Sequence, residues 1–291
     1  MKRLPDYLKR NIGSIDEVKN IRSLIKEFNL NTVCDEARCP NKTECFKNNT
    51  ATFMILGKNC SRNCKFCNIH NGSPESVNEN EPDNIALAVK KLNLKYCVIT
   101  SVTRDDLSDQ GANQFIRTIN SIKTQSNNST KIEILTPDFQ GNETLITDIL
   151  DSSPDVFNHN IETVPALYPK VRPQAIFERS IKVLNFAKTN FDIITKTGIM
   201  IGFGESLDEL KYVFGILANI NCDILTIGQY IPPSKKHIPV KKFYTPDEFV
   251  FLNNLAISSG IKKVISAPLT RSSYQAFEAF LSVKNMYNKP S

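Results

Sequence analysis

Six of the eight cysteines fall in two groups of three between Cys34 and Cys67. The second group, Cys60, Cys64 and Cys67, has the spacing C-x3-C-x2-C. Three thiolates this close in sequence can hold three corners of a cubic iron–sulfur cluster and leave one iron open for a further ligand. A structural zinc site with His70 as the fourth ligand is the alternative, although closed zinc sites usually take their four ligands as two pairs.

The first group consists of Cys34, Cys39 and Cys45, with the spacing C-x4-C-x5-C. These three thiolates can also hold three corners of a cluster, but by themselves they fit a zinc site or chance equally well. The remaining two cysteines, Cys97 and Cys222, lie in apolar strand-like contexts, where a cysteine usually packs as a small hydrophobic residue.

The elements that must position these residues alternate between two types along the chain. Short β-branched runs predict strands, at residues 52–56, 96–100, 131–136, 155–160, 193–201, 223–229 and 263–267. Between them lie amphipathic stretches, most clearly Leu210, Val213, Phe214 and Leu217 at helical spacing. This alternation predicts an α/β fold with a parallel sheet, and six such units favour a barrel or partial barrel over an open sheet.

In parallel α/β folds the chemistry lies at the carboxyl ends of the strands. Polar clusters follow the predicted strands there, at residues 100–106, 158–162, 202–205 and 229–230. The glycines of residues 198–204 do not form a dinucleotide fingerprint, because that motif opens the first helix after a strand. A Rossmann nucleotide site is therefore excluded.

Composition limits the class of protein. The chain has 291 residues, of which 41% are hydrophobic and 23% charged, which excludes collagen, coiled coil and wholesale disorder. The formal net charge of +6 is spread over scattered lysine doublets, so we expect no nucleic-acid partner. Neither a signal peptide nor an apolar run of about 18 residues is visible, so we expect no membrane partner and a reducing compartment. That compartment is the cytoplasm, or an organelle if a transit peptide has been removed.

The C-x3-C-aromatic-C pattern, with Phe66 in the aromatic position after the first strand of a β/α chain, resembles the signature of the radical S-adenosylmethionine (SAM) enzymes. The resemblance implies a partial (β/α)6 TIM-like barrel and a 4Fe–4S cluster on Cys60, Cys64 and Cys67. It also implies that SAM chelates the open iron and is cleaved to methionine and a 5′-deoxyadenosyl radical.

Both cysteine groups together resemble the lipoyl synthase family over residues 15–285. The resemblance extends to residues 30–34, 50–57, 99–102, 104–107, 154–160, 171–173, 228–230 and 271–274. It implies an auxiliary 4Fe–4S cluster on Cys34, Cys39 and Cys45, with Ser273 as the fourth ligand. A hydroxyl oxygen is a hard ligand among soft sulfurs and should be the easiest ligand to displace. For the preceding Ser272 we expect helix N-capping before the apolar run 274–280.

The implied reaction inserts two sulfur atoms, at C6 and C8, into an octanoyl chain attached to a lysine. One SAM is used for each position, and the auxiliary cluster is consumed as sulfur donor. The implied cofactor contacts are Phe66, Thr100, Ser101, Arg104, Asp105, Asn158, Glu162, Lys196, Glu205 and Arg271. The chain departs from the family pattern at Thr103, Gln110 and Ala267, and we expect His237 to be exposed in a loop.

The implied partners are octanoylated lipoyl-carrier domains, namely E2 subunits of 2-oxoacid dehydrogenases and the glycine cleavage H protein. An electron donor such as ferredoxin or flavodoxin is also implied. We expect an N-terminal extension at residues 1–51 with the auxiliary ligands, a partial barrel at 52–235 and a C-terminal extension at 236–291 with the serine ligand. Two alternatives remain: another sulfur-inserting radical SAM enzyme of the biotin-synthase kind, and a non-enzymatic zinc or iron–sulfur protein.

Overall fold

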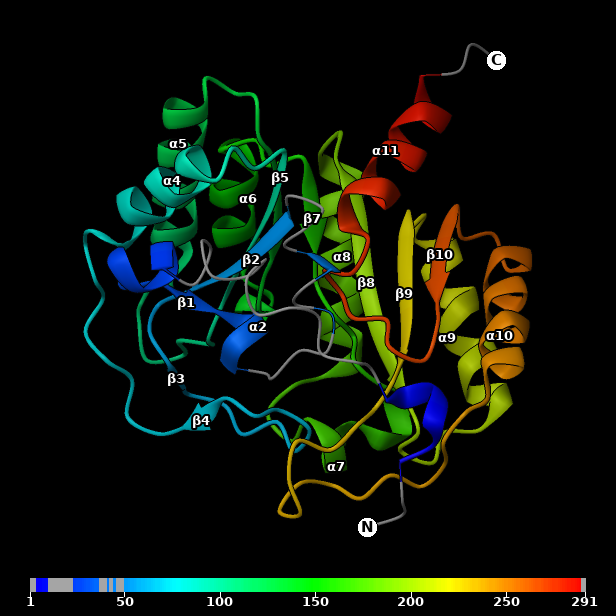
Figure 1. Cartoon of the computed structure of the whole chain (residues 1–291). Coiled ribbons are helices and arrows are strands. Elements are labelled where there is room, and N and C mark those ends of the chain that lie inside the picture. The colour runs from blue at the N-terminus through cyan, green and yellow to red at the C-terminus, as the bar shows by residue number, and fades with distance from the viewer. Residues whose placement is uncertain (1–3, 10–22, 37–40, 42–43, 46–49, 289–291) are drawn as a thin grey trace. The chain divides into compact units, whose positions relative to one another are not determined.

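A computed structural model describes residues 4–9, 23–36, 41, 44–45 and 50–288, without the side chains of residues 34 and 35 (Figure 1). The chain forms two compact units. The N-terminal unit consists of residues 11–63 and 68–157, and the C-terminal unit of residues 1–10, 64–67 and 158–291. The eight-residue segment that carries Cys60, Cys64 and Cys67 thus contributes to both units.

The N-terminal unit is built on parallel strands with helices packed beside them (Figure 1). Its strands are β1 (Asn31–Thr32), β2 (Thr50–Ile55), β3 (Asn59–Cys60), β4 (His70–Asn71), β5 (Tyr96–Ser101), β6 (Lys131–Leu135) and β7 (Val156–Asn158), of which the last residue, Asn158, belongs to the C-terminal unit. Its helices are α2 (Val33–Glu36), α4 (Glu81–Lys91), α5 (Ala112–Ser126), η2 (Phe139–Gly141) and α6 (Glu143–Asp151). The strands β2, β5 and β6 pair in parallel, and β1 adds an antiparallel edge that the sequence does not predict. All six residues of β2 are buried, as expected of a parallel strand covered on both faces.

The C-terminal unit repeats the same construction with the parallel strands β8 (Ile194–Ile201), β9 (Ile224–Gln229) and β10 (Lys263–Ser266). Its helices are η1 (Asp6–Leu8), η3 (Pro165–Leu167), α7 (Tyr168–Val171), α8 (Phe177–Asn190), α9 (Leu207–Asn219), α10 (Pro246–Ser258) and α11 (Ala276–Tyr287). Ser206 begins α9 with a capping box to Glu209, and the predicted stripe from Leu210 to Leu217 is buried. No helix in the described ranges is long and apolar enough to cross a membrane.

All seven predicted strands are confirmed, and their ends lie within two residues of the predicted bounds. The alternation of strands and helices and the parallel pairing are confirmed as well. The departure at Gln110 also receives a structural explanation. Its backbone has φ +50°, in the left-handed region that glycine adopts without strain, which accounts for glycine in the family pattern.

A buried carboxylate joins α8, β10 and α11 to the start of β9. The Asp223 side chain is fully buried and accepts hydrogen bonds from Lys188 Nζ at 2.8 Å, Lys262 Nζ at 2.7 Å and the Tyr287 hydroxyl. The backbone N–H of Thr195 donates to it at 2.9 Å. Burial alone would raise the pKa of Asp223, but the two lysines outweigh this effect and hold the pKa below its usual value.

Replacing Asp223 with asparagine is expected to lower the free energy of unfolding at pH 7 by about 3 kcal/mol, because two lysines lose their buried counter-charge. Since the folded-state pKa is lowered, this stabilisation is present above the unfolded-state pKa of about 4 and is lost as the pH falls through the folded-state value. Urea unfolding of the wild type and of Asp223→Asn at pH 7 and pH 3.5 measures the difference in their free energies of unfolding. A difference between them that stays constant with pH would contradict it.

Candidate active site

The loop with the second cysteine group lies between two short paired strands. β3 and β4 pair in parallel, with Asn59 opposite His70 and Cys60 opposite Asn71. Two further hydrogen bonds stabilise this pairing: Gly72 N–H and Asn71 Nδ2 donate to the Cys60 carbonyl at 3.4 and 3.3 Å. The pairing brings the two ends of the loop together. All three cysteines of this group are partly exposed.

In the N-terminal unit the sulfur of Cys60 faces two backbone donors. The N–H of Arg62 lies 3.4 Å from Cys60 Sγ, and the N–H of Thr103 lies 3.3 Å from it. Amide donors aimed at a cysteine sulfur stabilise the thiolate and are a regular feature of iron–sulfur ligation. The two backbone N–H groups at the Cys60 sulfur are therefore consistent with a role of Cys60 as a cluster ligand.

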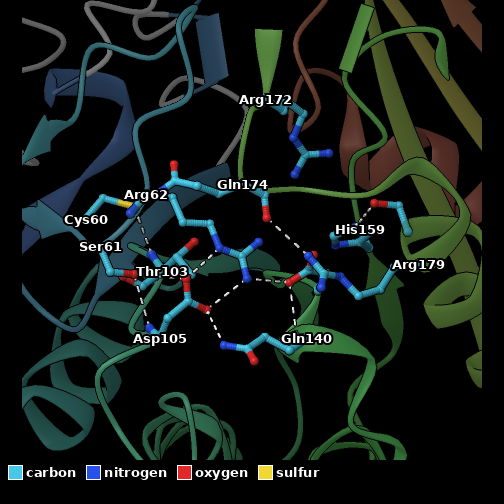
Figure 2. A network of polar contacts seen from close by, with 12 residues as sticks. Cys60, Ser61, Arg62, Thr103, Asp105, Gln140, His159, Arg172, Gln174 and Arg179 are labelled. Carbon is cyan, nitrogen blue, oxygen red and sulfur yellow. Dashed lines mark hydrogen bonds and ion pairs between the residues drawn. The ribbon is translucent and has the colours of Figure 1, made fainter. Parts of the chain in front are cut away.

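Ser61 and Arg62 attach this loop to the segment that follows β5 (Figure 2). The N–H and the hydroxyl of Ser61 both donate to the Thr103 carbonyl at 3.0 Å, and the Asp105 N–H donates to Ser61 Oγ at 3.1 Å. The guanidinium of Arg62 donates twice to Asp105, at 2.7 and 2.8 Å. At Thr103, where the chain departs from the family pattern, the loop is held by backbone groups, so the substitution leaves these contacts intact.

Three of the other predicted cofactor contacts follow or end β5. Thr100 is buried and donates to the Leu135 carbonyl at 2.8 Å. The buried hydroxyl of Ser101 has no hydrogen-bond partner within the part of the chain that is described. Arg104 is buried and forms an ion pair with Asp106 at 2.8 Å. Of these three side chains, Ser101 is the one whose polar group no other described residue satisfies.

In the C-terminal unit, backbone bonds hold the segment from Cys64 to Cys67. The Lys65 N–H donates to the Val171 carbonyl at 2.9 Å, and the Ile238 N–H donates to the Lys65 carbonyl at 3.4 Å. Phe66 packs against a small core formed by Val171, Phe203 and Tyr230. The rings of Phe203 and Tyr230 are stacked with centroids 4.2 Å apart. The aromatic position of the motif thus has a packing role in addition to the cofactor contact predicted for it.

His237 lies in a loop, as expected, but the expectation that it is exposed is wrong. The imidazole is partly buried, with Nε2 3.0 Å from the Cys67 carbonyl and Nδ1 2.9 Å from Ser234 Oγ. Because a carbonyl oxygen only accepts, Nε2 carries the proton and Nδ1 accepts from the serine hydroxyl. The expectation failed because the Cys67 partner lies 170 residues away, beyond the reach of local sequence context.

Replacing His237 with phenylalanine is expected to lower the free energy of unfolding by about 1 kcal/mol, because the Cys67 carbonyl loses its donor. Replacement with glutamine, whose amide can donate to the same oxygen, should restore part of this loss. Urea unfolding of the two variants and the wild type measures the difference. Equal stability of both variants would show that the hydrogen bond to Cys67 contributes nothing.

Ser272 is not a helix N-cap as expected, because α11 begins only at Ala276. Its hydroxyl instead donates to Asn160 Oδ1 at 2.7 Å and accepts from Asn158 Nδ2 at 3.4 Å. Asn160 Nδ2 in turn donates to Glu162 Oε1 at 3.0 Å. The segment with Ser273 is therefore attached, through Ser272, to the polar residues that follow β7.

Glu162, a predicted cofactor contact, has an unusual backbone and an altered acidity. Its φ of +65° lies in the left-handed region, which costs a residue with a side chain about 1 kcal/mol. Burial raises the pKa of its carboxyl, while the positive charges of Arg172 and Arg271 act in the opposite direction. Strain and altered acidity together are typical of functional positions.

The remaining predicted contacts of this unit have different surroundings. Lys196 is completely buried in β8. The carboxylate of Glu205 accepts from three successive backbone N–H groups, of residues 202, 203 and 204, at 2.6, 3.0 and 3.1 Å. This geometry fixes the turn after β8, so the Glu205 carboxylate is already occupied by the protein backbone. Arg271 and Ser273 are partly exposed beside Ser272.

The first cysteine group is only partly described. Cys45 is partly exposed, whereas Cys39 and the side chain of Cys34 lie outside the described residues. Among the side chains that are described, no group of three or more His, Cys, Asp or Glu is arranged to hold a metal ion. Cys97 and Cys222 are buried, as expected, and burial raises the pKa of both thiols, that of Cys222 to about 12.

Comparison with known proteins identifies the family. The profile of the Radical SAM superfamily matches residues 54–217, and the profile of the N-terminal domain of lipoyl synthase matches residues 1–39. A curated lipoyl synthase from Alkaliphilus metalliredigens is 48% identical over 96% of this chain and 96% of its own length. Another, from Caldicellulosiruptor saccharolyticus, is 50% identical over 94% of this chain and 96% of its own length. The chain belongs to the lipoyl synthase family.

Solved structures agree on the fold. Methylornithine synthase aligns with a TM-score of 0.55 at 14% identity, over 94% of this chain and 93% of that chain. SuiB of Streptococcus suis, in a structure bound to S-adenosylmethionine, aligns with a TM-score of 0.59 at 12% identity, over 92% of this chain and 68% of that chain. The predicted α/β fold of the radical SAM type is therefore confirmed. As a lipoyl synthase of this superfamily, the chain is an enzyme that uses SAM and a 4Fe–4S cluster.

Sequence reasoning missed three residues around the cysteine loop of this lipoyl synthase: Arg62, Asp138 and His237. Asp138 lies after β6, so the rule that polar residues at strand ends are functional could have found it. Arg62 lies within the motif, between Cys60 and Cys64, but an arginine at a variable position of a cysteine motif is by default interpreted as a solvated surface residue. Only the three-dimensional contacts distinguish these residues from the other polar residues of the loops.

Proposed function

We propose that this chain inserts sulfur atoms at C6 and C8 of a protein-bound octanoyl-lysine, giving lipoyl-lysine, with SAM as the radical source. The observation that supports it best is that both cysteine groups and Ser273 occur together in a chain similar to lipoyl synthases over nearly its full length. Cys60, Cys64 and Cys67 would hold the SAM-binding 4Fe–4S cluster. Bound there and reduced, the cluster supplies the electron that cleaves SAM and starts the radical chemistry.

The second part of the proposal concerns the source of sulfur. Cys34, Cys39, Cys45 and Ser273 would bind an auxiliary 4Fe–4S cluster, which is consumed as a substrate of the reaction. Ser272 supports this assignment, because its hydrogen bonds to Asn158 and Asn160 hold the neighbouring Ser273 in a fixed segment. This ligand assignment is consistent with a division of the chain into three parts. Residues 1–51 and 236–291 would carry the auxiliary ligands, and residues 52–235 would form the barrel.

The protein's own side chains would position SAM and the acyl chain and exclude water from the radical. Phe66, Thr100, Ser101, Arg104, Asp105, Asn158, Glu162, Lys196, Glu205 and Arg271 are the proposed contributors. Among them, Ser101 and Glu162 have the strongest support. The Ser101 hydroxyl is buried with no partner in the described part of the chain, and Glu162 combines a strained backbone with a raised pKa.

The proposed macromolecular partners are the octanoylated carrier domains of 2-oxoacid dehydrogenase E2 subunits and of the glycine cleavage H protein. Ferredoxin or flavodoxin is the proposed electron donor. The proposed location is the cytoplasm, or an organelle if a transit peptide has been removed, because six clustered cysteines remain available as thiolate ligands only in a reducing compartment.

Anaerobic reconstitution followed by mass spectrometry tests the function. The reconstituted protein is incubated with an octanoyl-lysine peptide, SAM and dithionite, and the peptide mass is compared with that of a control without SAM. We expect a product in which two C–H hydrogens are replaced by two sulfurs. An unchanged peptide accompanied by active SAM cleavage would indicate a different substrate, and a protein that takes up stoichiometric zinc but no iron would contradict the cluster assignment.

A further inference from the structure

Arg62 lies between two of the cluster cysteines and has a side chain that the proposed reaction does not use. Its guanidinium is almost completely buried. Nε and Nη2 donate to the two oxygens of Asp105 at 2.7 and 2.8 Å, and Nη2 also donates to Asp138 Oδ1 at 2.7 Å. Arg62, Asp105 and Asp138 form what we call the Arg62 ion-pair network. A buried arginine that binds two carboxylates, one of them bidentately, is held in a single orientation.

Each carboxylate of the network is itself fixed by the strand end that carries it. Asp105 follows β5 and also accepts from the Gln140 amide at 3.3 Å. Asp138 follows β6, is fully buried, and accepts from the Gln140 N–H at 3.1 Å where η2 begins. The network therefore attaches the loop after β3 to the ends of two neighbouring parallel strands, β5 and β6.

The network also controls the surroundings of the Cys60 sulfur. The two N–H groups that face Cys60 Sγ belong to Arg62 and Thr103, and these residues stand on the two segments that the Arg62–Asp105 pair joins. The Arg62 N–H lies on the same loop as Cys60, whereas the Thr103 N–H comes from the segment after β5. If the pair is weakened, that segment is held to the loop by the Ser61 contacts alone, and the Thr103 N–H can move away from the sulfur. Hydrogen bonds to cluster sulfurs favour the reduced, more negative state, so their loss lowers the reduction potential.

We infer that the Arg62 ion-pair network positions Cys60 as a cluster ligand and, through the amide donors on its sulfur, sets the reduction potential of the SAM-binding cluster. Arg62 acts here as a positioning residue, since its guanidinium faces carboxylates of the protein. The inference rests on the proposed function only in requiring a cluster on this cysteine loop.

Replacing Arg62 with lysine tests the inference, because lysine keeps the charge and loses the bidentate geometry. The readout is a redox titration of the reconstituted full chain. The titration is monitored through the electron paramagnetic resonance signal that changes when SAM is added. Because only the SAM-binding cluster responds to SAM, this signal distinguishes it from any auxiliary cluster. We expect the midpoint potential to become more negative and a chelator to remove iron about tenfold faster than from the wild type.

Two further variants keep the test independent of folding. Asp138→Asn leaves the Arg62–Asp105 pair in place and should give a smaller increase in the rate of iron loss. If Arg62→Lys does not fold, this variant still tests the inference. Asp223→Asn removes a carboxylate that is equally buried and bound to cations in the other unit, and should destabilise the chain without changing the SAM-responsive signal.

The inference would be overturned if Arg62→Lys kept the wild-type midpoint potential and the wild-type rate of iron loss. It would also be overturned if Asp223→Asn showed the lower potential and faster iron loss expected of Arg62→Lys. A wild type that binds a SAM-responsive cluster but leaves the octanoyl peptide unchanged would contradict the proposed substrate and leave the inference standing. Absence of a SAM-responsive cluster in the wild type would overturn both.

Discussion

Replacing Cys64 with alanine is expected to abolish SAM cleavage, with a loss of activity of at least about 1000-fold. A 4Fe–4S cluster that binds SAM needs three protein thiolates, and with two it lacks the ligands to remain intact. The loss should therefore appear in the first chemical step, before any substrate is involved. Release of methionine and 5′-deoxyadenosine under dithionite measures it, together with the iron content of the protein.

The matched control is Cys97→Ala, which removes the same thiol from a fully buried position in β5. This variant loses some packing, at about 1–2 kcal/mol for a small buried group, but should keep its iron and its SAM cleavage. Loss of SAM cleavage in both variants would mean that folding, and not ligation, explains the effect. SAM cleavage by Cys64→Ala at the wild-type rate would contradict the role of this cysteine group.

The strands could be predicted because their signal is local. The parallel strands of this chain are rich in β-branched and aliphatic residues, as in Tyr96–Ser101, and burial on both faces favours that composition. The antiparallel strand β1 was missed because two residues, Asn31 and Thr32, carry no such pattern. Its pairing with β2 depends on the neighbouring strand and leaves no trace in its own sequence.

The cysteine groups could be read from spacing alone, but the residues that support them could not. His237 binds the Cys67 carbonyl, Asp138 binds Arg62, and Ser272 binds Asn160, across 170, 76 and 112 residues respectively. Each of these polar residues looks like an ordinary loop or cap residue in its local sequence. The rule for strand ends predicts where such polar residues gather, while their pairing depends on how the loops fold.

The structure also changes how the predicted cofactor contacts are ranked. Asp105 and Glu205 have side chains that are already bound by Arg62 and by three backbone N–H groups. Both groups shape the loops around the site, so their removal should affect loop geometry before it affects ligand contacts. Ser101, with its buried hydroxyl, is better placed to take a ligand. Residue type and position alone therefore do not distinguish residues that would bind a ligand from residues that support the loops.

Replacing Cys39 with alanine is expected to separate the two reactions of the proposed function. SAM cleavage should continue, because Cys60, Cys64 and Cys67 are intact, while formation of lipoyl-lysine should fall below detection for want of a sulfur source. The iron content should drop from about eight to about four per chain, since one of two 4Fe–4S clusters is lost. Mass spectrometry of the octanoyl-lysine peptide and quantification of 5′-deoxyadenosine in the same sample measure both reactions.

The pattern of products decides between the two roles proposed for the cysteines. Cys222→Ala, a change at a buried thiol in the C-terminal unit, serves as the control and should form lipoyl-lysine normally. Full lipoylation by Cys39→Ala would mean that the first cysteine group does not supply sulfur, and the chain would then need another donor. Loss of both reactions would mean that the two groups depend on each other for cluster binding. Continued SAM cleavage without sulfur insertion is the outcome that assigns radical generation to one cysteine group and sulfur donation to the other.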